Sequence, residues 1–254
     1  MGDIGVKFKY LDEYNVELLK KVNQNINNLK DEKLNSEIVS IFEDITNEID
    51  DSVYTAKESK KILISLFYAL EIIRENIEKN GIVRQNEFFE EEKNQDSIAK
   101  ELLEGMIISA KNEYEENKLR YYGYLLGNIF FQNDLYKDES NRLIRIIRTL
   151  SYCQIRLINM YVISQTIQVP ILKREDYIKC GIHDYKLLGI LQDTLDMIQK
   201  GILNGSGKLV LDVVQINPSK IKVQGCGTLL YNLMCLNKMP YDELEDLLEI
   251  LSNK

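Results

Sequence analysis

The chain has 254 residues, of which 44% are hydrophobic, and this is enough for a substantial core in one large domain or two smaller ones. Its formal net charge of -8 opposes general binding to phosphate backbones, although a local basic patch could still bind them. No stretch approaches the roughly 18 to 20 apolar residues that cross a bilayer, so we expect that this is not an integral membrane protein.

The first 168 residues are predicted to form a multi-helix domain. Apolar residues recur every three or four positions, as in an amphipathic helix, in residues 11–49, 98–114 and 138–161. Thr55 and Glu58 match a capping box, which predicts a further helix that ends at Asn80-Gly81 and lies near the centre of the domain. Residues 82–96 lack a period and are predicted to form a loop.

Two glycines, Gly123 and Gly127, lie four residues apart in a helix predicted for residues 119–131. They therefore share one face of that helix. Glycine inside a helix costs up to about 1 kcal/mol relative to alanine, and close approach of another backbone would compensate for this cost. We therefore expect these glycines to be helix-packing positions.

A domain boundary is predicted at Pro170, because the residue before a proline resists the helical conformation. Residues 171–254 are predicted to form a second, smaller domain. It begins with a short helix and a second helix that ends at Gly201. Two runs rich in β-branched residues, 208–216 and 220–224, predict a β-hairpin, and two closing helices follow.

This order of helix, turn, helix, hairpin and helix resembles a winged-helix domain over residues 171–235. "LLGILQDTLDMIQKGIL" stands where such domains carry spaced leucines followed by Gly-Leu-Ile, and "IKVQGCGTLLYNLM" is similar to the segment that follows their wing. The predicted fold class is therefore mainly α: an N-terminal multi-helix domain followed by a small α+β winged-helix-like domain with one β-hairpin.

Many winged helices bind DNA, and many others pack only against protein. This chain departs from the DNA-binding kind in the helix that would enter the groove and just before it. The polar positions there are Asp184, Gln192, Asp193 and Asp196. Carboxylates would repel phosphates, whereas DNA-binding winged helices present arginine or lysine.

The segment "ILNGSGKLVLDVV", residues 202–214, invites comparison with a phosphate-binding loop. Such a loop needs a glycine where Ile202 stands, and a Ser or Thr after the lysine where Leu209 follows Lys208. It also lies between a strand and a helix, whereas this segment is predicted to follow a helix and open a strand. We therefore predict a flexible connection here. "GCGTLL", residues 225–230, lacks the third glycine of a dinucleotide fingerprint and is predicted to be a turn into a helix.

Few residues suit metal or thiol chemistry. The only histidine, His183, follows Cys180, but Gly181 breaks the helix between them and nothing predicts a depressed thiol pKa. The four cysteines, at positions 153, 180, 226 and 235, lack the spacing of a zinc site or of a disulfide framework. The acidic run Glu90–Glu92 is expected to be solvated. We predict no metal, no cofactor, and reduced thiols in a cytosol.

Residues 120–180 carry nine basic and five acidic side chains, which makes this segment locally basic. Candidate residues for binding an anion or a nucleic acid are Arg120, Arg142, Arg145, Arg148 and Arg156. The last four lie on the single long helix that is predicted from residue 138. The alternative, which we favour, is that these arginines pair with the acidic N-terminal helices and need no ligand.

No catalytic constellation is found, and hydrophobic helices are plentiful. The sequence therefore favours a non-enzymatic protein-interaction or regulatory module, with a protein partner or self-association and no membrane. A DNA-binding transcriptional regulator is the first alternative, and an enzyme that acts on nucleotides through the basic, tyrosine-rich middle is the second. The bias to Ile, Lys and Asn is compatible with a bacterial or phage cytosol.

Overall fold

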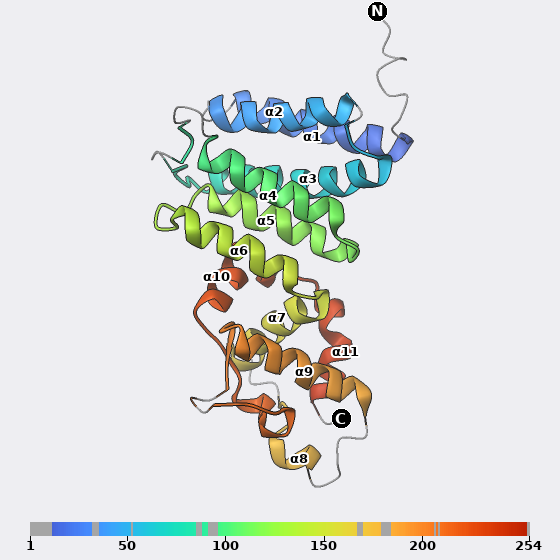
Figure 1. Ribbon diagram of the computed structural model, residues 1–254, viewed down its shortest axis with the longest axis vertical. Coiled ribbons are helices and arrows are strands. Elements are labelled where there is room, and N and C mark those ends of the chain that lie inside the picture. Colours follow the sequence, from blue (N-terminus) through green and yellow to red (C-terminus); the bar gives the residue numbers. More distant parts are fainter. Residues whose placement is uncertain are drawn as a thin grey trace, which may run out of the picture. The chain divides into compact units, whose positions relative to one another are not determined.

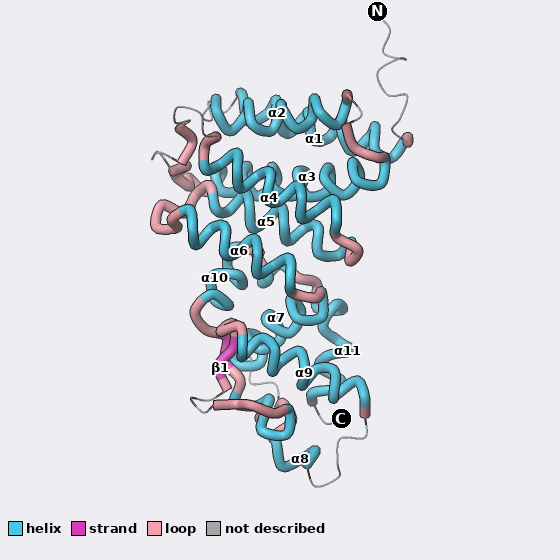
Figure 2. Tube along the Cα trace, in the orientation of Figure 1, coloured by secondary structure: helices cyan, strands magenta, loops and turns pink. Residues whose placement is uncertain are grey.

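The computed structural model describes residues 12–31, 36–51, 53–84, 88–90, 96–166, 170–178, 184–205, 207 and 209–252. This part of the chain is mainly α-helical and contains one small two-stranded antiparallel sheet (Figures 1 and 2). The chain divides into two compact units, Met1–Thr149 and Leu150–Lys254. None of the described helices is both long enough and apolar enough to cross a membrane.

The first unit is built from helices, which Figure 2 shows joined by loops and turns. Their bounds are α1 Glu13–Asp31, α2 Ser36–Asp50, α3 Ala56–Glu78, α4 Ile98–Asn112, the 3-10 turn η1 Glu116–Lys118, α5 Leu119–Ile129 and α6 Lys137–Thr149.

Helix α3 is the central helix of this unit, as the sequence predicted. It contacts α1, α4 and α5, and buried residues occupy much of its circumference. The predicted capping box at its start is confirmed. The Thr55 hydroxyl accepts the Glu58 N–H at 3.3 Å, and the Glu58 carboxylate accepts the Thr55 N–H at 3.0 Å.

Gly123 and Gly127 lie where α5 packs against α3. A Cβ atom added at Gly123 would lie 2.3 Å from the Ser65 carbonyl oxygen and 2.8 Å from the Ala69 nitrogen. A Cβ atom added at Gly127 would lie 2.6 Å from the Ala69 carbonyl oxygen. Since real Cβ atoms do not approach other atoms this closely, α3 and α5 can pack at this distance only because both positions are glycine.

The segment predicted as a loop at residues 82–96 contributes to the core. Phe88 and Phe89 are buried, and both rings meet Phe130, the residue that ends α5, in edge-to-face contacts with centroid distances of 5.9 and 5.7 Å. Burial of such large apolar side chains stabilises the packing around this connection.

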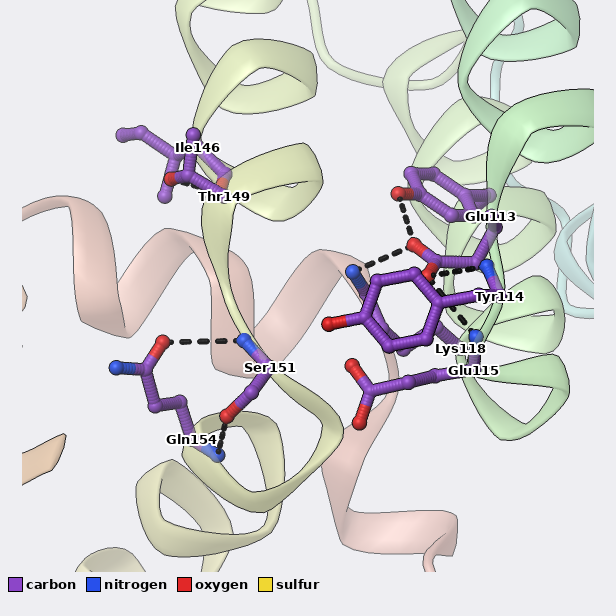
Figure 3. A network of polar contacts seen from close by, with 9 residues as sticks. Glu113, Tyr114, Glu115, Lys118, Ile146, Thr149, Ser151 and Gln154 are labelled. Carbon is purple, nitrogen blue, oxygen red and sulfur yellow. Dashed lines mark hydrogen bonds and ion pairs between the residues drawn. The ribbon is translucent and has the colours of Figure 1, made fainter.

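The single long helix predicted over residues 138–161 is wrong, because the structure has two helices there. Helix α6 ends at Thr149, and α7 begins at Tyr152. Ser151 and Gln154 cap the new helix reciprocally (Figure 3): the Ser151 hydroxyl accepts the Gln154 N–H, and the Gln154 side chain accepts the Ser151 N–H, both at 3.1 Å. These bonds satisfy backbone donors that a continuous helix would have used internally.

The second unit combines short helices with the sheet. Its elements are α7 Tyr152–Thr166, α8 Arg174–Ile178, α9 Tyr185–Gln199, β1 Leu203–Asn204, η2 Val213–Gln215, η3 Pro218–Lys220, β2 Lys222–Val223, α10 Cys226–Leu233, η4 Leu236–Lys238, η5 Tyr241–Leu244 and α11 Glu245–Leu251.

The predicted strand over residues 208–216 is absent from the described part of that segment. Strand β1 lies earlier, at residues 203–204, and pairs with β2 in the register Leu203 to Val223. Two local signals explain the difference. The Asp212 side chain accepts the Val214 N–H and starts the 3-10 turn η2, and Pro218 at the first position of η3 starts another.

Helix α7 belongs to the second unit, in which it contacts β2, α9, α10 and α11. The sequence placed the boundary between residues 168 and 171 and assigned this segment to the first domain. The structure divides the chain between Thr149 and Leu150, next to the turn that Ser151 caps.

Candidate interaction surfaces

Three arginines of α6 form an exposed row, which we call the arginine stripe: Arg142, Arg145 and Arg148. Their spacing of three residues keeps them on one side of the helix. No ion pair or hydrogen bond joins their guanidinium groups to any residue that the structure describes. The pairing with the acidic N-terminal helices that the sequence favoured is therefore not made within the described chain.

The other two candidate arginines lie elsewhere. Arg120 belongs to α5 and stacks on the Tyr121 ring, 4.7 Å from its centroid. Arg156 belongs to α7, where its guanidinium forms an ion pair with Asp246 and donates to the Glu243 carbonyl oxygen. Arg156 thus holds α7 against the C-terminal helices. Arg120 and Arg156 therefore already have contacts within their own units, in contrast to the arginine stripe.

A buried polar network lies where α4 connects to α5 (Figure 3). The Glu113 carboxylate accepts hydrogen bonds from Lys118 Nζ at 2.6 Å and from the Tyr122 hydroxyl at 2.8 Å. Its other oxygen accepts the backbone N–H groups of Tyr114 and Glu115 at 2.9 and 3.1 Å. The side chains of Glu113 and Lys118 are only 5% and 3% exposed.

The protonation of this network indicates a structural role. Burial alone would raise the pKa of Glu113, but hydrogen bonds from Lys118, the Glu115 N–H and Tyr122 hold that pKa below its ordinary value. Burial, and then the charge of Glu113, raise the pKa of the Tyr122 hydroxyl. Tyr122 therefore keeps its proton, and the carboxylate is already saturated with donors. The network locks the α4–α5 connection and offers neither a free base nor a nucleophile.

A groove of about 330 Å³ lies between α2 and α4, and we call it the acidic groove. Ile41, Ile45 and Leu103 give it an apolar floor. The polar side chains that line it are Asp44, Asn47, Glu48, Asp51, Lys100 and Glu104. The sequence did not single out this groove, although Asp44 and Glu48 of α2 and Asp51, which directly follows α2, recur at helical spacing.

The charge of the acidic groove is not compensated locally. Its one lysine, Lys100, already forms an ion pair of 2.7 Å with Asp96. Asp44, Asp51 and Glu104, which we call the rim carboxylates, have no cationic partner among the described residues. The rim therefore presents three carboxylates without a cation beside an apolar floor.

The pKa of Tyr54 indicates a negative electrostatic potential near the acidic groove. Its hydroxyl donates to the Glu48 carboxylate at 2.9 Å. Burial first, and then the neighbouring carboxylates of Glu48, Glu104 and Glu58, raise the pKa of Tyr54 to about 12. The field that raises this pKa would stabilise a cationic ligand in the same place.

The second unit exposes an apolar segment in place of the predicted hairpin strand. Leu209 and Leu211 are 81% and 68% exposed, whereas Val210 between them is 6% exposed. This alternation is typical of an extended segment with one exposed side and one buried side. Lys208, which made the segment look like a phosphate-binding loop, lies outside the described residues, as do Cys180 and His183.

The acidic residues of α9 serve the packing of the second unit. The Asp184 side chain caps α9 by accepting the Lys186 N–H at 2.8 Å. Asp193 and Asp196 accept the side-chain amide of Gln154 at 3.0 and 2.8 Å and so link α9 to α7. The helix that the resemblance would place in a DNA groove thus carries carboxylates in its own packing interface.

No group of three or more His, Cys, Asp or Glu side chains that could hold a metal ion occurs in the described residues. Of the predicted acidic run, Glu90 is exposed, while Glu91 and Glu92 lie outside the described residues. Comparison with protein-family models, with curated proteins and with solved structures finds no match to this chain.

Proposed function

We propose that the protein is a non-enzymatic, cytosolic interaction module whose acidic groove binds a basic amphipathic helix. The observation that carries this proposal is the combination of an apolar floor with three uncompensated rim carboxylates. An amphipathic helix lays its apolar face into such a groove. Flanking arginines or lysines then meet the carboxylates, which steers the encounter and fixes the register.

Binding of a short labelled peptide tests this proposal. The peptide carries leucines at helical spacing flanked by arginines, and its affinity is followed by fluorescence anisotropy. Changing the rim carboxylates to lysine is expected to weaken binding about tenfold or more, because like charges then face each other. Changing Ile41 to serine is expected to weaken binding without a change in charge, because the floor loses apolar contact.

A matched control has the same change in net charge at a distant place. Asp242, Glu245 and Glu249 are exposed in the second unit, and changing all three to lysine is expected to leave peptide binding intact. Equal loss of binding in this control and in the groove variant would show nonspecific attraction to an acidic protein. That result would contradict the proposal.

The second candidate function is nucleic-acid binding by the arginine stripe, which would suit a DNA-binding regulator. The observation that favours it is the exposure of three guanidinium groups without a described partner. The winged-helix-like resemblance of the second unit adds little support, because Asp193 and Asp196 occupy the helix that would have to approach phosphates.

A gel-shift titration at several salt concentrations tests the second candidate. Three phosphate contacts would give a slope of log K against log salt of about -2.7 for duplex DNA. Arg145→Glu is expected to abolish the shift, whereas the neutral Arg145→Gln is expected to reduce the slope. Unchanged mobility on random and genomic DNA at low salt would rule this candidate out.

A further inference from the structure

The first unit itself carries a helix with the chemistry that the acidic groove requires. The arginine stripe spans six residues of α6, or about 9 Å along the helix axis. Asp44 lies on α2 and Asp51 directly follows its last residue, seven positions further on, or about 10.5 Å at the rise of a helix. Both rows therefore have similar lengths and opposite charges, and both lack partners within the described chain.

Helix α2, which lines the groove, and helix α6, which carries the stripe, lie at different ends of the first unit (Figure 1). Helix α2 packs on α1, whereas α6 packs on α4 and α5. Helix α4 lines the groove on one side and contacts α6 on another, so it lies between the two surfaces. The arginine stripe therefore cannot fill the groove of its own chain.

We propose that the acidic groove of one copy binds the arginine stripe of a second copy. This inference rests on the proposed function and names the partner of the same groove. Ile146 is partly exposed one turn after Arg142 on α6, where it provides apolar surface beside the stripe for the floor of the groove. The arginines meet the rim carboxylates, so charges that have no partner in the described chain become compensated on both sides.

The geometry of this contact determines the assembly. The groove and the stripe are different surfaces, so the contact is heterologous, and each copy retains one free groove or one free stripe after pairing. The groove and the stripe that one contact leaves free either pair with each other, which closes a dimer, or bind further copies, which builds rings or open chains. Because the charges lie at the surface, salt weakens the association.

Sedimentation velocity over a range of protein concentrations tests the proposal. The full chain is expected to form dimers or larger species at low salt, and these are expected to dissociate at high salt. A chain that stays monomeric at every concentration at low salt would overturn this inference. If the groove still binds the basic peptide in that case, the proposed function stands; if the peptide also fails to bind, both fall.

Two charge-reversed variants make the test specific. One changes the arginine stripe to glutamate, and the other changes the rim carboxylates to lysine. Each alone is expected to lose self-association, with affinity weakened about 100-fold, because like charges then face each other. An equal mixture is expected to associate again, since the unaltered groove of one variant pairs with the unaltered stripe of the other, and the reversed groove pairs with the reversed stripe.

Further variants check this reading. The chain that carries both reversals is expected to associate again, whereas the control with Asp242, Glu245 and Glu249 changed to lysine is expected to behave like the wild type. Circular dichroism checks the fold, and neutral variants (Arg→Gln, Asp→Asn and Glu→Gln) replace any reversed variant that does not fold. Persistent association of either reversed variant alone, or an equal mixture that stays monomeric, would refute the proposal.

Discussion

Replacing Lys118 by methionine is expected to lower the free energy of unfolding by about 3 to 5 kcal/mol, because it leaves a buried carboxylate without its cation. Lys118 Nζ lies 2.6 Å from Glu113, and both side chains are almost fully buried. The Tyr122 hydroxyl and two backbone N–H groups remain as donors, but they do not neutralise the charge. Urea unfolding followed by circular dichroism measures the loss.

Two further variants separate the buried charge from general damage. Adding Glu113→Gln to Lys118→Met removes both charges, and the double variant is expected to lose less stability than the two single variants together. Lys60→Met breaks an exposed pair with Glu116 at 3.2 Å and is expected to cost less than about 1 kcal/mol. A cost for Lys118→Met no larger than that of Lys60→Met would contradict the role of this network.

Acid is expected to reduce the difference between the wild type and Lys118→Met. The pKa of Glu113 in the folded chain lies below its ordinary value, so the folded state binds this proton less readily than the unfolded chain does. The stabilisation is therefore complete at neutral pH. It is lost as the pH falls below the unfolded value of about 4.3 and through the lower folded pKa.

The helices of the first unit were largely readable from the sequence, because local signals and the apolar period agree there. Thr55 and Glu58 marked the start of α3, and the structure shows both capping bonds. The break between α6 and α7 also has a local signal in the sequence, since Ser151 and Gln154 fit a capping box. However, the apolar period continues from Ile147 to Leu150, and for this reason the period alone predicted one continuous helix.

The second unit was harder to predict, because local turn signals compete there with strand propensities. β-Branched residues favoured a strand near residue 213, but Asp212 and Pro218 turn the chain there. The acidic groove needs two helices that are distant in sequence, and no pattern in α2 shows that α4 lies beside it. The pairing of Glu113 with Lys118 spans a turn that has no helical period.

Replacing Gly123 by alanine is expected to destabilise the first unit by about 2 kcal/mol or more, although alanine is the better helix former by up to about 1 kcal/mol. The added Cβ would lie 2.3 Å from the Ser65 carbonyl oxygen, and backbone atoms cannot move aside as a flexible side chain could. Helices α3 and α5 must therefore separate, and contacts along their shared core are lost. Urea unfolding of the full chain measures this loss.

Gly105→Ala is the matched control, because it is also a helical glycine of the first unit. A Cβ added at Gly105 meets only Ile144, at the ordinary contact distance of 3.9 Å. This variant is expected to stabilise the chain by roughly 0.5 to 1 kcal/mol through helix propensity alone. Opposite signs for the two substitutions would locate the close approach of α3 and α5 at Gly123. If Gly123→Ala were as stabilising as Gly105→Ala, the two helices would not pack backbone to backbone at this position.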